Sequence, residues 1–182
     1  MLAIAFDFET TGLLLHPDAK LAKQPSAIEF GCVLIDASGE IFQHESLLIN
    51  PGQRLDPIIT KITGLTDADL EDKPRFGDHL PRLRELFAEA DIMVAHNLPF
   101  DAGILECGLA RVGATDFPWP KHKLCTAQAY AEEWGRRPRL QELYAAIIGR
   151  PIVQTHRALD DARMLAEILI KEGLLYDFYS AA

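Results

Sequence analysis

Two acidic side chains, Asp7 and Glu9, stand two residues apart near the start of the chain. Branched and aromatic residues at positions 4–8, with Gly12 shortly after, predict a buried strand that carries both acids. Because side chains alternate along a strand, the two carboxylates leave the same face, about 7 Å apart. Acids at the end of an apolar strand are costly to ionise without a cation, and their hard oxygens suit Mg²⁺ or Mn²⁺. A strand that simply runs out into solvent is the less favoured explanation of the pair taken alone.

The elements that must position this pair begin with two more strands. After an irregular segment, residues 28–35 and 41–49 are rich in apolar and branched side chains. The turn residues Asp-Ala-Ser-Gly at positions 36–39 join them. Because strands joined by tight turns pair antiparallel, we expect a three-strand antiparallel meander.

From residue 55 the pattern changes from strand to helix. Residues 57–62 predict a short helix that ends at Gly64. Thr66 followed by Asp69 resembles a capping box, with aspartate in place of glutamate. A longer helix is expected to begin at Asp78, and its apolar face consists of Leu80, Leu83 and Phe87.

A fourth buried strand, residues 91–95, leads into a second polar cluster. Asn97 is the predicted N-cap of the next helix, and Pro99 is tolerated in its first turn. Asp101 then falls in that first turn, where the helix dipole favours an ionised acid.

The last third of the chain alternates short elements before one long helix. We expect a short strand at residues 124–126, a helix through Tyr130 and Trp134, a helix over residues 139–148, and a final long helix after His156. This last helix carries Asp161 near its start.

Five polar residues could do chemistry: Asp7, Glu9, Asp101, His156 and Asp161. Each lies at the end of a predicted strand or the start of a predicted helix. In an open α/β sheet such ends converge on one edge. Singly, each has an ordinary structural explanation as a helix-start acid, a capping histidine or a solvated helix face. Together they predict that the five side chains line a single pocket.

The composition is that of an ordinary globular protein, with 48% hydrophobic and 25% charged residues among 182. Its length favours one domain. The three cysteines are odd in number and lack metal-site spacing, which favours a reducing compartment. No secretory signal or membrane span is visible, so we expect a soluble, cytoplasmic protein.

The net charge of −9 argues against nonspecific coating of duplex nucleic acid, although acids that hold metal would account for part of it. The positive charge is grouped at residues 121–123 and 136–139, and a solvated surface and a functional role are equal explanations for both groups.

Three motifs together resemble the DEDDh 3′-5′ exonuclease family. Residues 6–12 (FDFETTG) resemble its first motif, residues 96–101 (HNLPFD) its second, and residues 156–161 (HRALDD) its third, with the His-x4-Asp spacing. Residues 61–66 and 72–74 also fit, so the resemblance covers essentially the whole chain. It is strongest to the proofreading epsilon subunits of bacterial DNA polymerase III.

The resemblance implies an RNase H-like α/β fold: a central mixed sheet, with the antiparallel three-strand meander, flanked by helices. It further implies a single exonuclease domain over residues 1–182. The implied activity removes nucleotides from the 3′ end of single-stranded or frayed DNA by two-metal hydrolysis, with two Mg²⁺ (or Mn²⁺) ions as cofactor.

Roles for the five polar residues also follow from the resemblance. Asp7 would contact both ions, Glu9 and Asp161 would hold the ion beside the attacking water, and Asp101 would serve the other ion. His156 would be the general base, because an imidazole can accept a proton near neutral pH.

Substrate contacts implied by the resemblance lie beside two of the motifs. The backbone of Thr10, Thr11 and Gly12 would grip the terminal nucleotide, and a glycine lets a ligand approach the backbone closely. Leu13 matches an apolar wedge beside the last base, and Phe100 and Asn97 would lie near it. Core packing is an equal explanation for the leucine and the phenylalanine, as is a structural cap for the asparagine.

Two features depart from the family pattern. Pro99 stands where small residues are common, which would reshape the floor of the pocket. The chain also ends about twenty residues after Asp161, without the epsilon subunit's further tail or a glutamine-led clamp-binding peptide. A polymerase or clamp partner is therefore left open, and we expect the partner to be the 3′ end of a single strand, with no membrane.

Three alternatives remain. The same chemistry could act on RNA, as in RNase T or oligoribonuclease relatives, since discrimination depends on how the 2′-hydroxyl is met. A haloacid-dehalogenase-type phosphatase also begins with two acids on a first strand, but it needs an aspartate where this chain has Glu9. A binding module with a decayed site is disfavoured because all five catalytic-type residues are present.

Overall fold

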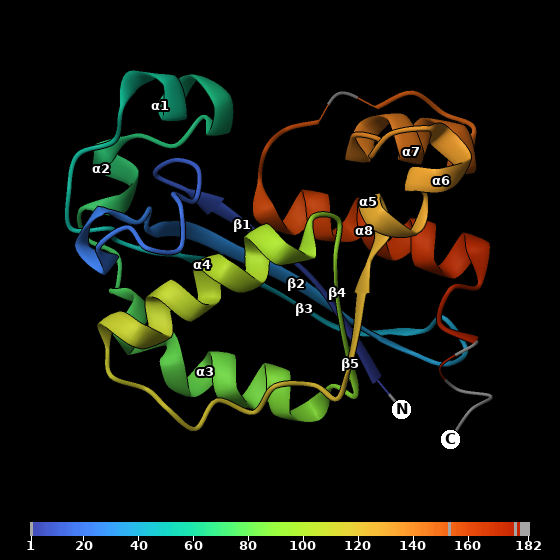
Figure 1. The fold of residues 1–182 in the computed structure, drawn as a ribbon, viewed down its shortest axis with the longest axis horizontal. Coiled ribbons are helices and arrows are strands. Elements are labelled where there is room, and N and C mark those ends of the chain that lie inside the picture. Colours follow the sequence, from blue (N-terminus) through green and yellow to red (C-terminus); the bar gives the residue numbers. More distant parts are fainter. Residues whose placement is uncertain (1, 153, 177, 179–182) are drawn as a thin grey trace.

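A five-stranded mixed sheet forms the centre of the protein in a computed structural model that describes residues 2–152, 154–176 and 178 (Figure 1). The strands are β1 (Leu2–Thr10), β2 (Ala27–Asp36), β3 (Ile41–Leu48), β4 (Ile92–Ala95) and β5 (His122–Cys125). Their order is β3-β2-β1-β4-β5, antiparallel from β3 to β1 and parallel from β1 to β5. The predicted meander within a mixed sheet is confirmed, and the strand ends lie within two residues of prediction.

Helices cover both faces of this sheet. In chain order they are α1 (Pro57–Thr63), α2 (Asp67–Leu70), α3 (Phe76–Glu89), α4 (Leu98–Arg111), α5 (Thr126–Ala129), α6 (Ala131–Trp134), α7 (Leu140–Ile148) and α8 (Ala158–Glu172), with a 3₁₀ turn at Leu21–Lys23. α3 and α4 pack on one face and α8 on the other (Figure 1). No helix in the described part of the chain is long and apolar enough to cross a membrane.

The predicted helix ends hold with small corrections. Gly64 ends α1, and Thr66 and Asp69 form the capping box of α2, both as predicted. α3 begins two residues before Asp78, because the Asp78 carboxylate accepts a hydrogen bond from the Arg75 backbone N–H and so caps the helix from inside its first turn. The helix expected through Tyr130 is two short helices that meet at this residue.

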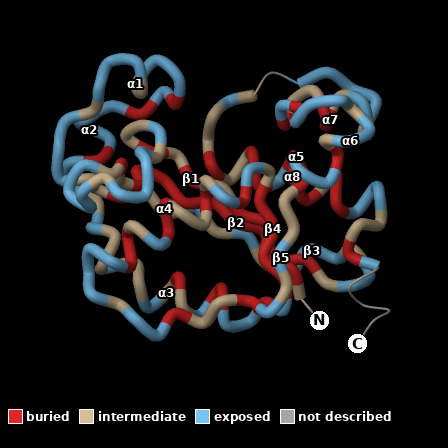
Figure 2. The backbone as a smooth tube through the Cα atoms, viewed as in Figure 1, coloured by how far each residue is buried: buried red, intermediate tan, exposed pale blue. Residues whose placement is uncertain are grey.

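Alternation along β1 decides what lies on each face of the sheet. Ile4, Phe6 and Phe8 enter the larger core with α3 and α4, whereas Ala3 and Ala5 face α8. Strands β1, β2 and β4 and the inner faces of these helices form the buried interior, whereas β3 and the outer faces of the helices are largely exposed (Figure 2). Because the residues under α8 are small, this helix lies close to the face that carries Asp7 and Glu9.

α8 approaches the backbone of the sheet closely at Gly31. Gly31 is paired with Asp7 across the antiparallel β1–β2 ladder, so both occupy the same face. A Cβ atom on Gly31 would stand 2.1 Å from the backbone nitrogen of Leu159. The start of α8 therefore rests on bare backbone, directly beside the acid pair.

Candidate functional site

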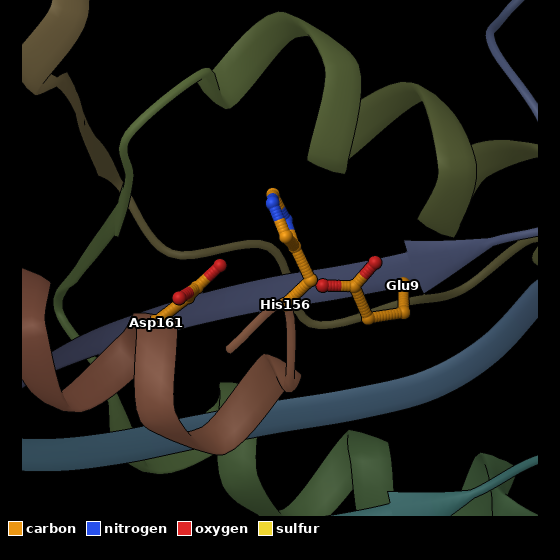
Figure 3. Close-up of side chains that lie close together, drawn as sticks. All are labelled: Glu9, His156 and Asp161. Atoms are coloured by element: carbon orange, nitrogen blue, oxygen red, sulfur yellow. The ribbon is translucent and has the colours of Figure 1, made fainter. Parts of the chain in front are cut away.

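The end of β1 and the start of α8 bring three of the predicted site residues together. Ligand atoms of Glu9, His156 and Asp161 all lie within 4.8 Å of one another. In Figure 3, Glu9 extends from β1, Asp161 from α8, and His156 from the segment that leads into α8. A carboxylate oxygen from β1, a carboxylate oxygen from α8 and an imidazole nitrogen from the segment before α8 thus lie close enough to bind one cation.

The start of α4 supplies Asp101 to the same place. Its carboxylate is only 2% exposed and accepts a hydrogen bond of 3.1 Å from the backbone N–H of Phe8. Because Phe8 stands between Asp7 and Glu9, this bond ties α4 to the acid pair. Burial, and then the charges of Asp101 and Asp161, raise the pKa of Asp7 well above its ordinary value. All five predicted residues therefore converge at one sheet edge.

Burial and mutual repulsion make these acids hard to ionise. Burial first, and then the neighbouring carboxylates, raise the pKa of Glu9 to about 8. Burial likewise raises the pKa of Asp101 to about 8 and that of Asp161 to about 6. The expectation that the helix start would favour ionised Asp101 is wrong for this site without metal, because loss of hydration outweighs the two backbone N–H groups that the carboxylate meets.

The donor set fits a divalent cation. Asp161 is buried, and its Oδ1 atom has no hydrogen-bond partner among the residues that the structure describes, while Oδ2 accepts from the Gln154 amide. Four carboxylates repel one another here, and Arg157 offsets part of the charge on Glu9. Carboxylate oxygens are the ligands that Mg²⁺ and Mn²⁺ prefer, and either ion would remove the repulsion.

His156 reaches the cluster through an unusual backbone conformation. Its φ angle is 52°, a left-handed value that non-glycine residues adopt rarely. Such strain is held only where the surrounding structure determines it, and functional sites are the usual place. Gln154 and Thr155 bond Asp161 and Asp160 of α8, and the next residue, Arg157, bonds Glu29 of β2, so the segment is held on both sides of His156.

Glu29 and Arg157 form an ion pair behind the site, with the glutamate buried and the arginine partly exposed, and the sequence reasoning missed it. Glu29 is 1% exposed and accepts from Arg157 Nε and Nη2 at 2.9 and 2.8 Å, and from the backbone N–H of Ala158 at 3.1 Å. Glu29 also lies opposite Glu9 in the β1–β2 ladder. The pair thus fixes the segment of His156 against the strand next to β1. A charged residue within the apolar run of β2 was the signal that could have found it.

The turn after β1 is held by its own hydroxyl groups. Thr10 Oγ1 donates to the carbonyl oxygen of Gly12, while the Thr11 backbone N–H and hydroxyl contact the backbone of Ser26 at 2.9 and 3.0 Å. A Cβ atom added to Gly12 would meet no described atom within 4 Å. The turn is therefore fixed and open on the side of the glycine.

The three other predicted substrate contacts differ in their surroundings. Leu13 is 80% exposed, so core packing does not explain this leucine. Phe100, in contrast, is partly buried and packs against the larger core. Asn97 occupies the N-cap position of α4 as predicted, but within the described chain its side chain makes no capping hydrogen bond.

Pro99 lines a groove of about 530 Å³ between α4 and the segment after the turn. The same groove is lined by Leu14, Leu15 and Gly103. The segment is ordered by Gln24, whose side chain bonds the backbone of Leu15 on both its nitrogen and its oxygen. The departure noted in the second motif therefore does lie on a groove wall, one residue from Phe100.

Sequence comparison identifies the family and the relatives that this chain resembles. A family model described as "Exonuclease" (RNase_T) matches residues 4–169. The DNA polymerase III subunit epsilon of Treponema pallidum is 36% identical over 169 residues, which cover 90% of this chain and 73% of that protein. A PolC-type DNA polymerase III of Clostridium perfringens is 31% identical over 166 residues, or 91% of this chain. The chain spans only 11% of that polymerase.

A solved structure extends the likeness to the fold. The nuclease domain of 3′hExo, described as a DEDDh family member bound to rAMP, superposes with a TM-score of 0.75 at 17% identity. The superposition covers 97% of this chain and 92% of that domain. The mixed sheet and its flanking helices therefore have the RNase H-like exonuclease arrangement.

Proposed function

Because the chain belongs to the exonuclease family, we propose that it is a metal-dependent 3′-5′ exonuclease that releases nucleoside monophosphates from the 3′ end of single-stranded or frayed DNA. The observation that carries the proposal is the convergence of four carboxylates and His156 at one sheet edge. The relative named as a polymerase III epsilon subunit favours DNA as the substrate, and it also supports a polymerase as a proposed partner.

Two Mg²⁺ (or Mn²⁺) ions held by Asp7, Glu9, Asp101 and Asp161 would neutralise the scissile phosphate and make the attacking water more acidic. Within this site, His156 would take the proton of that water. Its ring lies beside Glu9 and Asp161, so it stands where the water would be oriented. Glu29 and Arg157 would keep the ring there by fixing the backbone next to it.

The terminal nucleotide of the substrate would be held next to the acids, by the turn after β1 and the start of α4. The open turn at Gly12 lets a nucleotide reach the backbone, and the exposed Leu13 offers an apolar surface to the terminal base. Asn97, whose side chain makes no capping hydrogen bond in the described chain, and Phe100 in the first turn of α4 would complete the pocket.

A 5′-labelled single strand tests the proposal. With Mg²⁺ we expect progressive shortening from the 3′ end, complete loss of activity in Asp7→Ala, and loss in EDTA. Asp72→Ala is the matched control, since Asp72 is an exposed acid paired with Lys73 outside the site. Equal cleavage by wild type and Asp7→Ala would refute the proposal.

Matched DNA and RNA strands of one sequence decide between the two substrates. The sugar preference depends on whether a 2′-hydroxyl finds a donor or acceptor in the pocket. We expect higher kcat/KM on DNA, and a reversed preference would assign the enzyme to RNA.

A further inference from the structure

We propose that the basic loop, residues 135–139 (GRRPR), binds the phosphodiester backbone of the substrate strand on the 5′ side of the bond that is cut. This inference rests on the proposed function. The loop connects α6 to α7. In Figure 1, these helices lie above the ends of β4 and β5, at the edge of the sheet where α4 and α8 also begin.

His96 ties this loop to the site. The carbonyl oxygen of Pro138 lies 2.9 Å from His96 Nε2, and since a carbonyl can only accept, Nε2 carries the proton. Burial lowers the pKa of His96, so the neutral ring is left to accept from the Thr126 hydroxyl at Nδ1. His96 directly precedes Asn97 at the start of α4. The loop is therefore anchored two residues before the helix that supplies Asp101.

One arginine of the loop is used to shape it. The Arg136 guanidinium bonds both oxygens of Glu142 at 2.9 and 3.0 Å and lies over the Trp134 ring at 5.9 Å. Glu142 also accepts from the backbone N–H of Arg139 at 2.8 Å. With Pro138 buried as well, the backbone of the loop is fixed before any ligand arrives.

The other two arginines are left for a ligand. Arg137 and Arg139 are exposed, and neither forms an ion pair with a residue in the described part of the chain. The protein has a net charge of −9, and its site is lined by carboxylates, so a polyanion is repelled until metal binds. Guanidinium groups carried on this fixed loop backbone would offset that repulsion and match a phosphate in geometry. A polyanionic strand is therefore the partner that this loop fits.

A comparison of two substrates tests the inference. Oligothymidylate reaches beyond the pocket, whereas the p-nitrophenyl ester of thymidine 5′-monophosphate occupies the pocket alone. In the double variant Arg137→Ala/Arg139→Ala, we expect KM for oligothymidylate to rise about tenfold relative to KM for the ester. The slope of log(kcat/KM) against log[salt] for the oligomer should become shallower by about 1.4, since each phosphate contact on a single strand contributes about 0.7.

Two controls separate charge from shape. Lys171→Ala removes one exposed charge from the last turn of α8 and should leave KM and the salt slope for both substrates as in wild type. Arg137→Lys/Arg139→Lys keeps the charges and should retain most of the salt slope.

Three results would overturn the inference. An unchanged KM and salt slope for oligothymidylate in the alanine variant would show that the loop does not touch the strand. An equal loss on both substrates would make the loop a structural support of the pocket. Inactive wild type on both substrates would refute the proposed function itself, and the inference with it, whereas the first two results leave that function standing.

Discussion

At the scale of single residues, the site combines one imidazole, that of His156, with four carboxylates. The ligand atoms of His156, Glu9 and Asp161 lie within 4.8 Å of one another. The His156 ring could therefore accept a proton or bind a cation. These two roles have different consequences when the ring is removed, because a general base acts on the rate and a ligand acts on metal affinity. The proposed function assigns the first role.

His156→Ala should lower kcat by about 10²–10⁴, the usual contribution of a positioned general base, while Mg²⁺ affinity stays nearly unchanged. Turnover of a labelled strand measures the first quantity, and the Mg²⁺-dependent rise in Tm measures the second. His44→Ala, at an exposed position on β3, is the control. A collapse of Mg²⁺ affinity in His156→Ala would make this residue a metal ligand.

At the scale of elements, the packing of α8 against β2 decides whether the site forms. The helix start is held by two features of β2: the bare backbone at Gly31, and the carboxylate of Glu29, which accepts hydrogen bonds from Arg157 and from the Ala158 N–H. Asp161 is carried on the first turn of the same helix. Any displacement of α8 therefore moves both His156 and Asp161 away from Glu9.

Gly31→Ala should cost about 3 kcal/mol of the free energy of unfolding, at the upper end of overpacking costs, because the new methyl group meets backbone that cannot rotate away. Activity should fall further than stability alone explains. Urea unfolding and strand cleavage measure the two effects. Gly12→Ala is the matched control for stability, since open space surrounds that position. Equal stability of the two variants would contradict this account of how α8 docks.

At the scale of the whole molecule, the buried acids of the site make stability depend on pH. Glu9 and Asp101 have pKa values raised to about 8, and that of Asp161 is raised to about 6. In the unfolded chain, the same groups titrate near pH 4. Between these limits the native state binds more protons than the unfolded state, so metal-free stability falls as pH rises.

In EDTA, the urea midpoint of the wild type should therefore be lower at about pH 8 than at about pH 6. Asp7→Asn should raise the midpoint at about pH 8, because it removes one of the repelling charges. Saturating Mg²⁺ should abolish the loss in the wild type. Asp72→Asn, an exposed acid outside the site, should follow the wild type in every condition. A midpoint that increases with pH in EDTA would contradict the raised pKa values.

The local pattern of residues determined most of the fold. Period-two alternation put Asp7 and Glu9 on one face with the alanines, and glycines and capping residues marked the helix ends. These features depend on neighbours a few positions away, which the sequence displays directly. The family motifs then predicted which residues would meet, and the structure brings all five to one edge.

Only the tertiary structure decided the electrostatics and the support of the site. Asp101 accepts its hydrogen bond from a residue 93 positions away, and Glu29 binds Arg157 across 128 positions. The helix dipole predicted an ionised Asp101, whereas burial among other acids, which no local pattern reveals, raises its pKa. The reason is physical: propensity and periodicity are properties of neighbouring residues, but loss of hydration and charge repulsion depend on which distant residues the fold places alongside.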